Sequence, residues 1–254
     1  MPAKNQSGYK RHLKVEGTFN LRDIGGYETS DGHRTRWGTY LRSDALCELP
    51  SMSQQTLIDY GIRTVIDLRT PEETEHSPNS FANSSDIKYH HRNAYGDNPL
   101  PRITNPPKSE DGTQNLFNIY AAMLDHKQPE VFKILSTLAD PDTMPVVVHC
   151  ASGQDRAGRI TALVLGIARV PKETIAYDYA LSSKFLVHRL YKQNPEMKTN
   201  GYTWQDYQRD HCPPRVMLKL LQHLDKNYGG VEGYARNTGL NETQISNIRK
   251  SIVE

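Results

Sequence analysis

The chain has 254 residues, with 31 lysine and arginine residues against 29 aspartate and glutamate residues, so its formal net charge is +2. This balance gives no general electrostatic reason to expect a nucleic acid or an anionic membrane surface as a partner. No apolar run approaches the roughly 20 residues that span a bilayer, so we expect no integral membrane segment. Three cysteines, Cys47, Cys150 and Cys212, cannot all pair with one another, and residues 1–19 lack the apolar core of a signal peptide. Both features favour a cytoplasmic location.

Strand and helix patterns alternate through the first two thirds of the chain. Residues 19–43 contain strand-like stretches around turn signals at Gly25-Gly26 and Asp31-Gly32. The pattern then predicts a helix at 49–59, strands at 63–69 and 87–93, a long loop at 96–115, a helix at 116–139, a strand at 145–149 and a buried helix at 158–169. Strands separated by helices indicate an α/β fold with a central, mostly parallel sheet flanked by helices.

The C-terminal hundred residues are predicted to be helical. Pro171 suits the first turn of one helix, and residues 215–227 form a second that stops at Gly229. Asn241, with Gln244 three residues later, is typical of the cap of a last helix.

No linker precedes these C-terminal helices, so we expect them to extend the same core. The sequence therefore predicts an N-terminal tail at 1–15 and a single domain at 16–254.

The residues from His149 to Arg159 read HCASGQDRAGR, between the predicted strand and the buried helix. Backbone N–H groups at such a junction converge, and the helix N-terminus adds positive potential, which makes an anion site. Gly153 allows the turn and a close approach of the backbone. The same N–H groups would stabilise a thiolate at Cys150, and Arg156 can direct two N–H donors to two phosphate oxygens. The alternative interpretation is a buried structural cysteine in a tight turn.

The spacing Cys150-x5-Arg156 after an apolar strand resembles the signature loop of the protein tyrosine phosphatase superfamily. The fuller form at 149–158 is similar to the atypical bacterial tyrosine/lipid phosphatases of the mycobacterial protein tyrosine phosphatase B type. Four further blocks follow the order expected for that group: NLRDIGGY at 20–27, LRSDA at 41–45, VIDLR at 65–69 and YGGVEGY at 228–234. The resemblance runs from about residue 16 to the C-terminus.

The resemblance implies a Cys-dependent, metal-independent phosphatase that needs no cofactor. Cys150 would attack phosphorus and form a phosphocysteine intermediate, while the loop holds the phosphate oxygens. The implied phosphate-binding residues are Ala151, Ser152, Gly153, Gln154, Asp155 and Arg156. Inorganic phosphate or vanadate would bind in the same loop. The scattered histidines, such as His90 and His91, show no metal-ligand spacing with a third ligand, so we expect no metal site.

The general acid has several candidates. Asp155 lies in the loop itself, where the subgroup pattern makes it an acid or a base, and bracing the loop is its alternative role. Asp97 follows a predicted strand, where the wider superfamily often carries its acid, and forming a turn beside Asn98-Pro99 is its alternative role. Asp125, inside a predicted helix, is a third choice.

Two positions depart from the family pattern. Ala157 stands where the superfamily usually has Ser or Thr, whose hydroxyl helps the cysteine leave in the second step; Ser152 is a partial substitute. Gln154 stands where the subgroup usually has Lys. The replacement removes a positive charge that would face the substrate at the mouth of the pocket.

Other polar residues near the predicted strand ends are interpreted as structural. We expect His149 to orient the loop backbone. We expect Asp67 and Arg69 to pair with Arg22 or Asp23.

Residues 185–212 form an aromatic and polar segment that, in the resembled subgroup, can cover the active site as a lid. Its aromatic side chains are Phe185, Tyr191, Tyr202, Trp204 and Tyr207, and an ordinary pair of surface helices is the alternative.

The predicted activity is hydrolysis of phosphomonoesters on a phosphorylated protein or a small molecule, with phosphotyrosine as the first choice. Phosphoinositides or inositol phosphates on the same loop are an alternative substrate class. A catalytically weak module that binds phosphorylated partners is a different class of function, which Ala157 supports. The sequence leaves the oligomeric state open.

Overall fold

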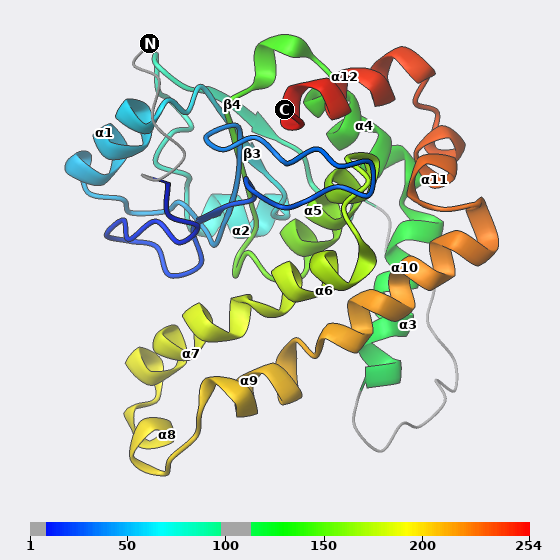
Figure 1. The fold of residues 1–254 in the computed structure, drawn as a ribbon. Helices are drawn as coiled ribbons and strands as arrows, with labels where there is room; N and C mark the ends of the chain where they lie inside the picture. Colours follow the sequence, from blue (N-terminus) through cyan, green and yellow to red (C-terminus); the bar gives the residue numbers. More distant parts are fainter. Residues whose placement is uncertain (1–8, 98–112) are drawn as a thin grey trace.

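A computed structural model of the chain describes residues 9–97 and 113–254. Its core contains a five-stranded sheet with strand order β1-β2-β5-β3-β4 (Figure 1). The strands are β1 (Arg22–Asp23), β2 (Tyr40–Ser43), β3 (Thr64–Asp67), β4 (Lys88–His91) and β5 (Val146–His149). Only β1 runs antiparallel to its neighbour. The predicted α/β class with a mostly parallel sheet is confirmed.

The two faces of the sheet bury different side chains because successive residues of a strand point to opposite faces. Val146 and Val148 of β5 belong to the larger apolar core, which also includes α5 (Arg156–Ile167). Val147, between them, belongs to a smaller core with Leu57 of α1 (Ser51–Tyr60). Central strands buried on both faces explain the continuous apolar runs in the sequence.

The remaining helices lie mostly in the second half of the chain. They are α2 (Pro71–His76), α3 (Thr113–His126), α4 (Gln128–Leu138), the 3₁₀ helix η2 (Pro141–Thr143), α6 (Lys172–Ala180), α7 (Ser182–Gln193), α8 (Pro195–Thr199), α9 (Trp204–His211), α10 (Pro214–Tyr228), α11 (Val231–Thr238) and α12 (Glu242–Ile252). The predicted cap of the last helix is confirmed, because Asn241 accepts from the N–H of Gln244 and the Gln244 side chain accepts from the N–H of Asn241.

Two predictions of local structure were wrong, and some short helices were missed. The single helix predicted at 116–139 is two helices, α3 and α4, which break at Lys127; Pro129 lacks the N–H that a continuous helix needs. The predicted loop 96–115 ends earlier, since α3 begins at Thr113; residues 98–112 lie outside the described residues. The short helices α2 and α11 were not predicted.

Helices α7, α8 and α9 form an arm that extends from the body of the molecule (Figure 1, yellow to gold). Within the arm α7 packs against α9. This arm coincides with the predicted lid segment 185–212, and its role as a lid stays a prediction.

The N-terminal segment lies against the sheet from Arg11 onward. The guanidinium of Arg11 donates to the carbonyls of Asp23 and Gly25, and Val15 is buried in the smaller core. Of the predicted tail, residues 1–8 lie outside the described residues. None of the helices in the described part of the chain is both long and apolar enough to cross a bilayer.

Candidate active site

The carboxyl ends of the four parallel strands lie in register at one edge of the sheet. Ser43 pairs with His149, His149 with Asp67, and Asp67 with His91. The segments that follow these strands therefore meet at this edge, which is where ligands bind in open α/β sheets. The predicted loop 150–156 follows the central strand β5 and leads directly into α5.

Gly153 allows this loop to lie against the strand beside it. Its φ of +69° is in the left-handed region, and a Cβ there would lie 2.6 Å from the backbone nitrogen of Asp44. A side chain at this position would therefore push the loop away from β2.

The loop carbonyls are held outward by groups from distant parts of the chain. The carbonyl of Ala151 accepts from Arg189 at 3.0 Å, and that of Ser152 accepts from the Asn20 amide at 2.9 Å. Arg42 donates to the carbonyl of Gly153 at 2.6 Å and to that of residue 154 at 3.2 Å. Because a carbonyl and the next N–H of its peptide plane point in opposite directions, we expect the N–H groups that follow these carbonyls to face the inside of the loop. N–H groups that converge in this way can bind an anion.

A buried ion cluster behind the loop fixes Arg42. Asp178 of α6 accepts from Arg42 at 2.7 Å and from the Tyr27 hydroxyl at 2.9 Å, and it pairs with Arg22 at 3.4 Å. Burial opposes ionisation of Asp178, but the two guanidinium groups outweigh it and lower its pKa to about 2. The cluster stays charged at neutral pH, so Arg42 remains in place under the loop.

Cys150 and Arg156 lie together at the ends of this loop. Cys150 is only 1% exposed. Burial opposes the charge of Arg156, but the hydrogen bond to Glu73, to which the nearby Cys150 adds in the same direction, raises the pKa of Arg156. Glu73 of α2 holds Arg156 through both carboxylate oxygens, one contact being 2.7 Å long. The ring of Tyr95 lies 5.1 Å from the guanidinium carbon of Arg156. The guanidinium is thereby oriented from two sides before any substrate arrives.

Glu73 also caps the helix on which it lies. One of its oxygens accepts from the N–H of Thr70, whose hydroxyl accepts from the N–H of Glu73. The hydrogen bond from Arg156 lowers the pKa of Glu73. The Thr-x-x-Glu pattern after a strand, with Pro71 at the first helical position, was a signal for α2 that the sequence reading missed.

His149 and Asp67 form a buried cluster beneath the loop. His149 contacts Asp67 at 3.4 Å and the Asn79 amide at 2.8 Å, and its other ring nitrogen lies 3.2 Å from the carbonyl of Cys150. Burial lowers the pKa of His149, so the ring is neutral near pH 7. This contact is consistent with the predicted role of His149 in orienting the loop backbone.

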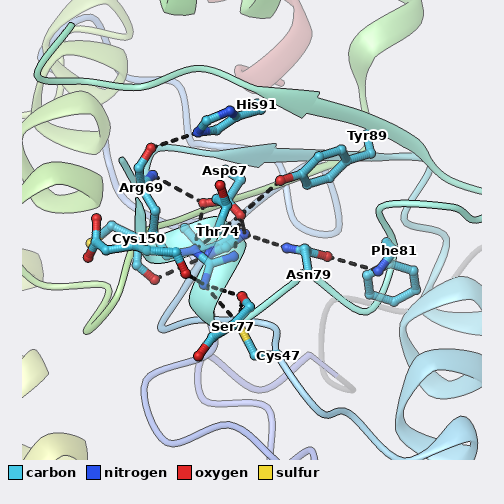
Figure 2. Close-up of polar contacts among 12 residues, drawn as sticks. Cys47, Asp67, Arg69, Thr74, Ser77, Asn79, Phe81, Tyr89, His91 and Cys150 are labelled. Carbon is cyan, nitrogen blue, oxygen red and sulfur yellow. Dashed lines mark hydrogen bonds and ion pairs between the residues drawn. The ribbon is translucent and has the colours of Figure 1, made fainter. Parts of the chain in front are cut away.

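Arg69 occupies the centre of that cluster (Figure 2). It pairs with Asp67 at 2.6 Å and donates to the carbonyl of Ser77 at 2.8 Å and to the sulfur of Cys47 at 2.9 Å. Our expectation that Asp67 and Arg69 pair with Arg22 or Asp23 was wrong. They lie two residues apart at the end of β3 and bind each other, which two residues on the same face of a strand end can do.

Asp155 is held by a pair of buried tyrosines. Its carboxylate accepts a hydrogen bond from the Tyr120 hydroxyl of α3, which lies 2.9 Å from the hydroxyl of Tyr179 on α6. Burial raises the pKa of Tyr120 well above its usual value, so it donates as a neutral phenol. Asp155 is at the cap position of α5, yet its side chain makes no capping hydrogen bond. Its carboxylate is therefore committed to Tyr120 rather than to the helix.

The two unusual loop positions are both buried. Gln154 is 6% exposed, and its amide nitrogen donates to the carbonyl of His211 at 3.1 Å and to Asp155 at 3.3 Å. The sequence analysis placed this side chain at the mouth of the phosphate pocket. In the structure it points instead to the end of α9. Ala157 is fully buried, and the Ser152 hydroxyl accepts from the N–H of Gln154 at 3.4 Å.

Beside these residues lies a cavity of about 440 Å³ between the loop, α3 and α9. Ser152, Gln154 and Asp155 line one wall, and Tyr207, Arg209 and Asp210 line another.

The other predicted acids differ in their surroundings. Asp97 is exposed and lies two residues after Tyr95, whose ring contacts Arg156. Asp125 accepts from the Tyr228 hydroxyl at 2.7 Å and from His223 at 2.9 Å, so it belongs to the contact between α3 and α10. The structure brings Asp155, and the segment that carries Asp97, to the loop, while Asp125 is engaged elsewhere.

The aromatic residues of the arm do not form one continuous lining. Tyr207 lines the cavity beside the loop, whereas Phe185 stacks on His12 with ring centroids 4.0 Å apart. The Tyr191 hydroxyl donates to the carbonyl of Tyr202 at 2.5 Å. The ammonium nitrogen of Lys184 lies over the ring of Trp204, 4.9 Å from the ring centroid.

Comparison with known proteins agrees with this arrangement. Residues 13–254 match the model of a family described as the tyrosine phosphatase family. The chain is 28% identical over 220 residues to a tyrosine-protein phosphatase of Nostoc commune, and the matched region covers 83% of this chain and 72% of the relative. It is 22% identical over 273 residues to the triple specificity protein phosphatase PtpB of Mycobacterium tuberculosis, covering 93% and 97% of the two chains. The chain therefore belongs to the tyrosine phosphatase family and is a phosphatase.

In the described residues, no group of three or more histidine, cysteine, aspartate and glutamate side chains is arranged to hold a metal ion. The residues around the loop that sequence analysis did not single out include Asn20, Arg42, Glu73, Tyr120, Asp178 and Arg189. Asn20 and Arg42 lie within two of the blocks quoted for the family resemblance, NLRDIGGY at 20–27 and LRSDA at 41–45.

Proposed function

We propose that the protein is a protein tyrosine phosphatase that hydrolyses phosphomonoesters, most readily phosphotyrosine, through a phosphocysteine intermediate. The observation that carries this proposal is the loop from Cys150 to Arg156, whose carbonyls are bound outward while Glu73 orients the arginine. Inward N–H groups and a fixed guanidinium stabilise the charge on the equatorial oxygens of a phosphoryl group in transfer.

The proposed reaction has two displacements at phosphorus. In the first, the Cys150 thiolate forms an S–P bond while the P–O bond to the substrate breaks, and a carboxylic acid gives its proton to the leaving oxygen. In the second, a carboxylate removes a proton from water, the water oxygen bonds to phosphorus, and the S–P bond breaks. The products are the free hydroxyl compound and inorganic phosphate, and the thiolate is regenerated.

Trapping the intermediate tests this proposal. Wild-type enzyme mixed with a ³²P-labelled phosphotyrosine peptide and quenched in acid within milliseconds should carry label on Cys150, and Cys150→Ser should carry none on that residue. Turnover of p-nitrophenyl phosphate should persist in EDTA. Turnover by Cys150→Ser at the wild-type rate, or label on another residue, would contradict the covalent mechanism.

Asp155 and Asp97 are the proposed proton carriers, and leaving groups of different basicity distinguish their roles. Loss of the general acid slows hydrolysis of phenyl phosphate far more than that of p-nitrophenyl phosphate, because p-nitrophenolate leaves without a proton. Asp155→Asn and Asp97→Asn should be compared on both substrates. For each variant, the loss of rate on phenyl phosphate is divided by the loss on p-nitrophenyl phosphate. The variant with the larger quotient lacks the general acid. A quotient near one in both variants would exclude these two residues from that role.

A second candidate function rests on Ala157, which is buried at the start of α5 and has no hydroxyl to assist the leaving thiolate. In that case the protein would capture phosphorylated partners and release them slowly. One equivalent of p-nitrophenol formed in a burst, without further turnover, would favour the binding module. Steady turnover favours the enzyme.

The substrate class is tested separately from the mechanism. Rates on phosphotyrosine peptides, soluble phosphoinositides and inositol phosphates should be compared at one ionic strength. We expect the highest kcat/KM on phosphotyrosine, and a higher value on a phosphoinositide would replace phosphotyrosine as the substrate without affecting the phosphocysteine step.

A further inference from the structure

A groove of about 500 Å³ lies between the N-terminal segment and α7. In Figure 1 the two segments are dark blue and yellow, and the stacking of His12 on Phe185 joins them. The residues that define this N-terminal groove are His12, Lys14, Phe19, Lys184, Phe185 and His188.

Both walls of the N-terminal groove connect directly to the catalytic loop. On one wall, Asn20 follows Phe19 and donates to the carbonyl of Ser152 at 2.9 Å. On the other wall, Arg189 follows His188 and donates to the carbonyl of Ala151 at 3.0 Å. The groove therefore leads away from the site where the phosphate would bind.

The N-terminal groove carries positive charge that no carboxylate of the described residues pairs with. Lys14, Lys184 and Lys192 are exposed, and within residues 9–97 and 113–254 none of them forms an ion pair. The ammonium group of Lys192 lies 6.0 Å from the ring of Phe19, at the edge of the groove. Glu16 is the single carboxylate among the described residues that line it. Unpaired cations beside a phosphate site attract an anionic ligand.

We propose that the N-terminal groove binds the acidic residues that flank phosphotyrosine in a peptide substrate. The proposal rests on the proposed function and adds the sequence context of the substrate. A peptide occupies a recessed channel walled by Phe19 and Phe185, and it can place glutamate side chains against the lysines. A membrane would also face the opposite rim of the loop. There Arg209 balances only one of its two partners, Asp206 and Asp210, and Asp155 adds a further negative charge, so this rim disfavours an anionic lipid surface.

Peptides that differ only in their flanks test this proposal. Each carries one phosphotyrosine, with three glutamates, three glutamines or three lysines on its N-terminal or its C-terminal side. On one of the two sides, we expect kcat/KM to be at least about tenfold higher for glutamate than for lysine, mostly through KM, and the ratio to fall as salt is raised from about 50 to 300 mM.

Charge reversal assigns the effect to the groove. The variant Lys14→Glu/Lys184→Glu/Lys192→Glu should remove the preference for glutamate and leave turnover of p-nitrophenyl phosphate within about twofold of wild type. The matched control Lys88→Glu/Lys226→Glu/Lys250→Glu changes the net charge equally at exposed positions on other elements and should keep the preference. Equal behaviour of the two variants, or a wild type that does not distinguish the flanks, would overturn the proposal.

Two further arms separate the other outcomes. If wild type fails to turn over p-nitrophenyl phosphate, the proposed function is wrong. Fluorescence anisotropy with fluorescently labelled versions of the same peptides then tests by binding alone whether the groove prefers glutamate flanks. Sedimentation with phosphatidylserine vesicles provides the second arm. Vesicle binding that the groove variant loses, together with no discrimination among peptides, would assign the groove to a membrane surface and reject the peptide.

Discussion

The two sides of the loop from Cys150 to Arg156 carry charge in different ways. On the N-terminal groove side the lysines are free of carboxylate partners within the described residues. On the α3–α9 side, Arg209 is already bound to Asp206 and Asp210, each at 2.8 Å, and Asp155 adds a further negative charge. Two paired opposite charges largely cancel each other's electrostatic potential, whereas unpaired charges can attract a ligand. In the proposed function the loop would supply an anion site common to all phosphomonoesters, and its two sides would supply the means to choose among them.

The largest effect should come from removing the chemistry that both sides share. Cys150→Ser should lower kcat by at least about a thousandfold, because the serine hydroxyl is not ionised near neutral pH. Vanadate binding, measured by calorimetry, should persist if the cradle is intact. A purified variant with comparable activity would show that the loop is not the reaction centre.

Removing the buried support of the loop should affect stability most. Asp178→Asn leaves Arg22 and Arg42 without their carboxylate, which costs about 3–5 kcal/mol of unfolding free energy. The exposed pair of Lys172 and Asp225 provides the control, since Asp225→Asn should cost less than about 1 kcal/mol. Urea unfolding measures both, and equal losses would show that the cluster is not what holds Arg42.

The same cluster predicts how stability depends on pH. Because the pKa of Asp178 is about 2 in the folded protein against 3.8 for the free side chain, its contribution is present above about pH 4 and is lost as the pH falls toward 2. The stability difference between wild type and Asp178→Asn should therefore narrow over that range. A difference that does not change with pH would contradict this account.

Ala157→Ser tests whether the missing hydroxyl at this position slows breakdown of the phosphoenzyme. The added hydroxyl can donate to the leaving thiolate, and we expect the phosphoenzyme to break down about twentyfold faster, which corresponds to about 1.8 kcal/mol and lies within the roughly 1.5–3 kcal/mol of a hydrogen bond to a charged group. Rapid-quench measurement of the phosphocysteine lifetime gives the result. Ala162→Ser, another buried alanine of α5, should leave the lifetime unchanged.

A smaller effect should follow from loosening Asp155 on the acidic side. Tyr120→Phe removes the hydroxyl that holds its carboxylate, and we expect kcat to fall about five- to tenfold with KM nearly unchanged, as for the loss of one hydrogen bond. Tyr179→Phe, one hydrogen bond further away, should have a weaker effect. An equal or larger loss in Tyr179→Phe would indicate that the tyrosines act through packing.

The smallest expected effect is a change in substrate preference from Gln154→Lys. A cation on the acidic side should raise kcat/KM for a soluble phosphoinositide relative to a phosphotyrosine peptide by about three- to tenfold, because solvent screening leaves only part of the attraction. Both substrates should be measured at fixed ionic strength. Since Gln154 is buried against His211, an unchanged ratio would mean that the lysine does not reach the substrate.

Local signals in the sequence were sufficient for the central motif and for several elements. The apolar strand before Cys150, Gly153 in the turn and the capping pair of Asn241 and Gln244 each depend on residues within a few positions of one another. The failures were also local in origin. A helix pattern was extended across Pro129, and the capping pattern from Thr70 to Glu73 was not recognised.

The sequence by itself determined the α/β class, the strand–loop–helix unit and the cysteine and arginine at its ends, because short-range backbone preferences and hydrophobic periodicity specify them. Only the tertiary structure decided which residues hold that unit. Glu73 and Arg156 are 83 residues apart, and Arg42 and Asp178 are 136 apart. No spacing rule connects such positions. They meet because the strand order β1-β2-β5-β3-β4 brings the ends of β2, β3 and β5 to one edge of the sheet. The N-terminal segment and α7 reach the loop through Asn20 and Arg189, and α3 and α9 reach it through Tyr120 and His211. The charge of each side is therefore a product of the folded chain.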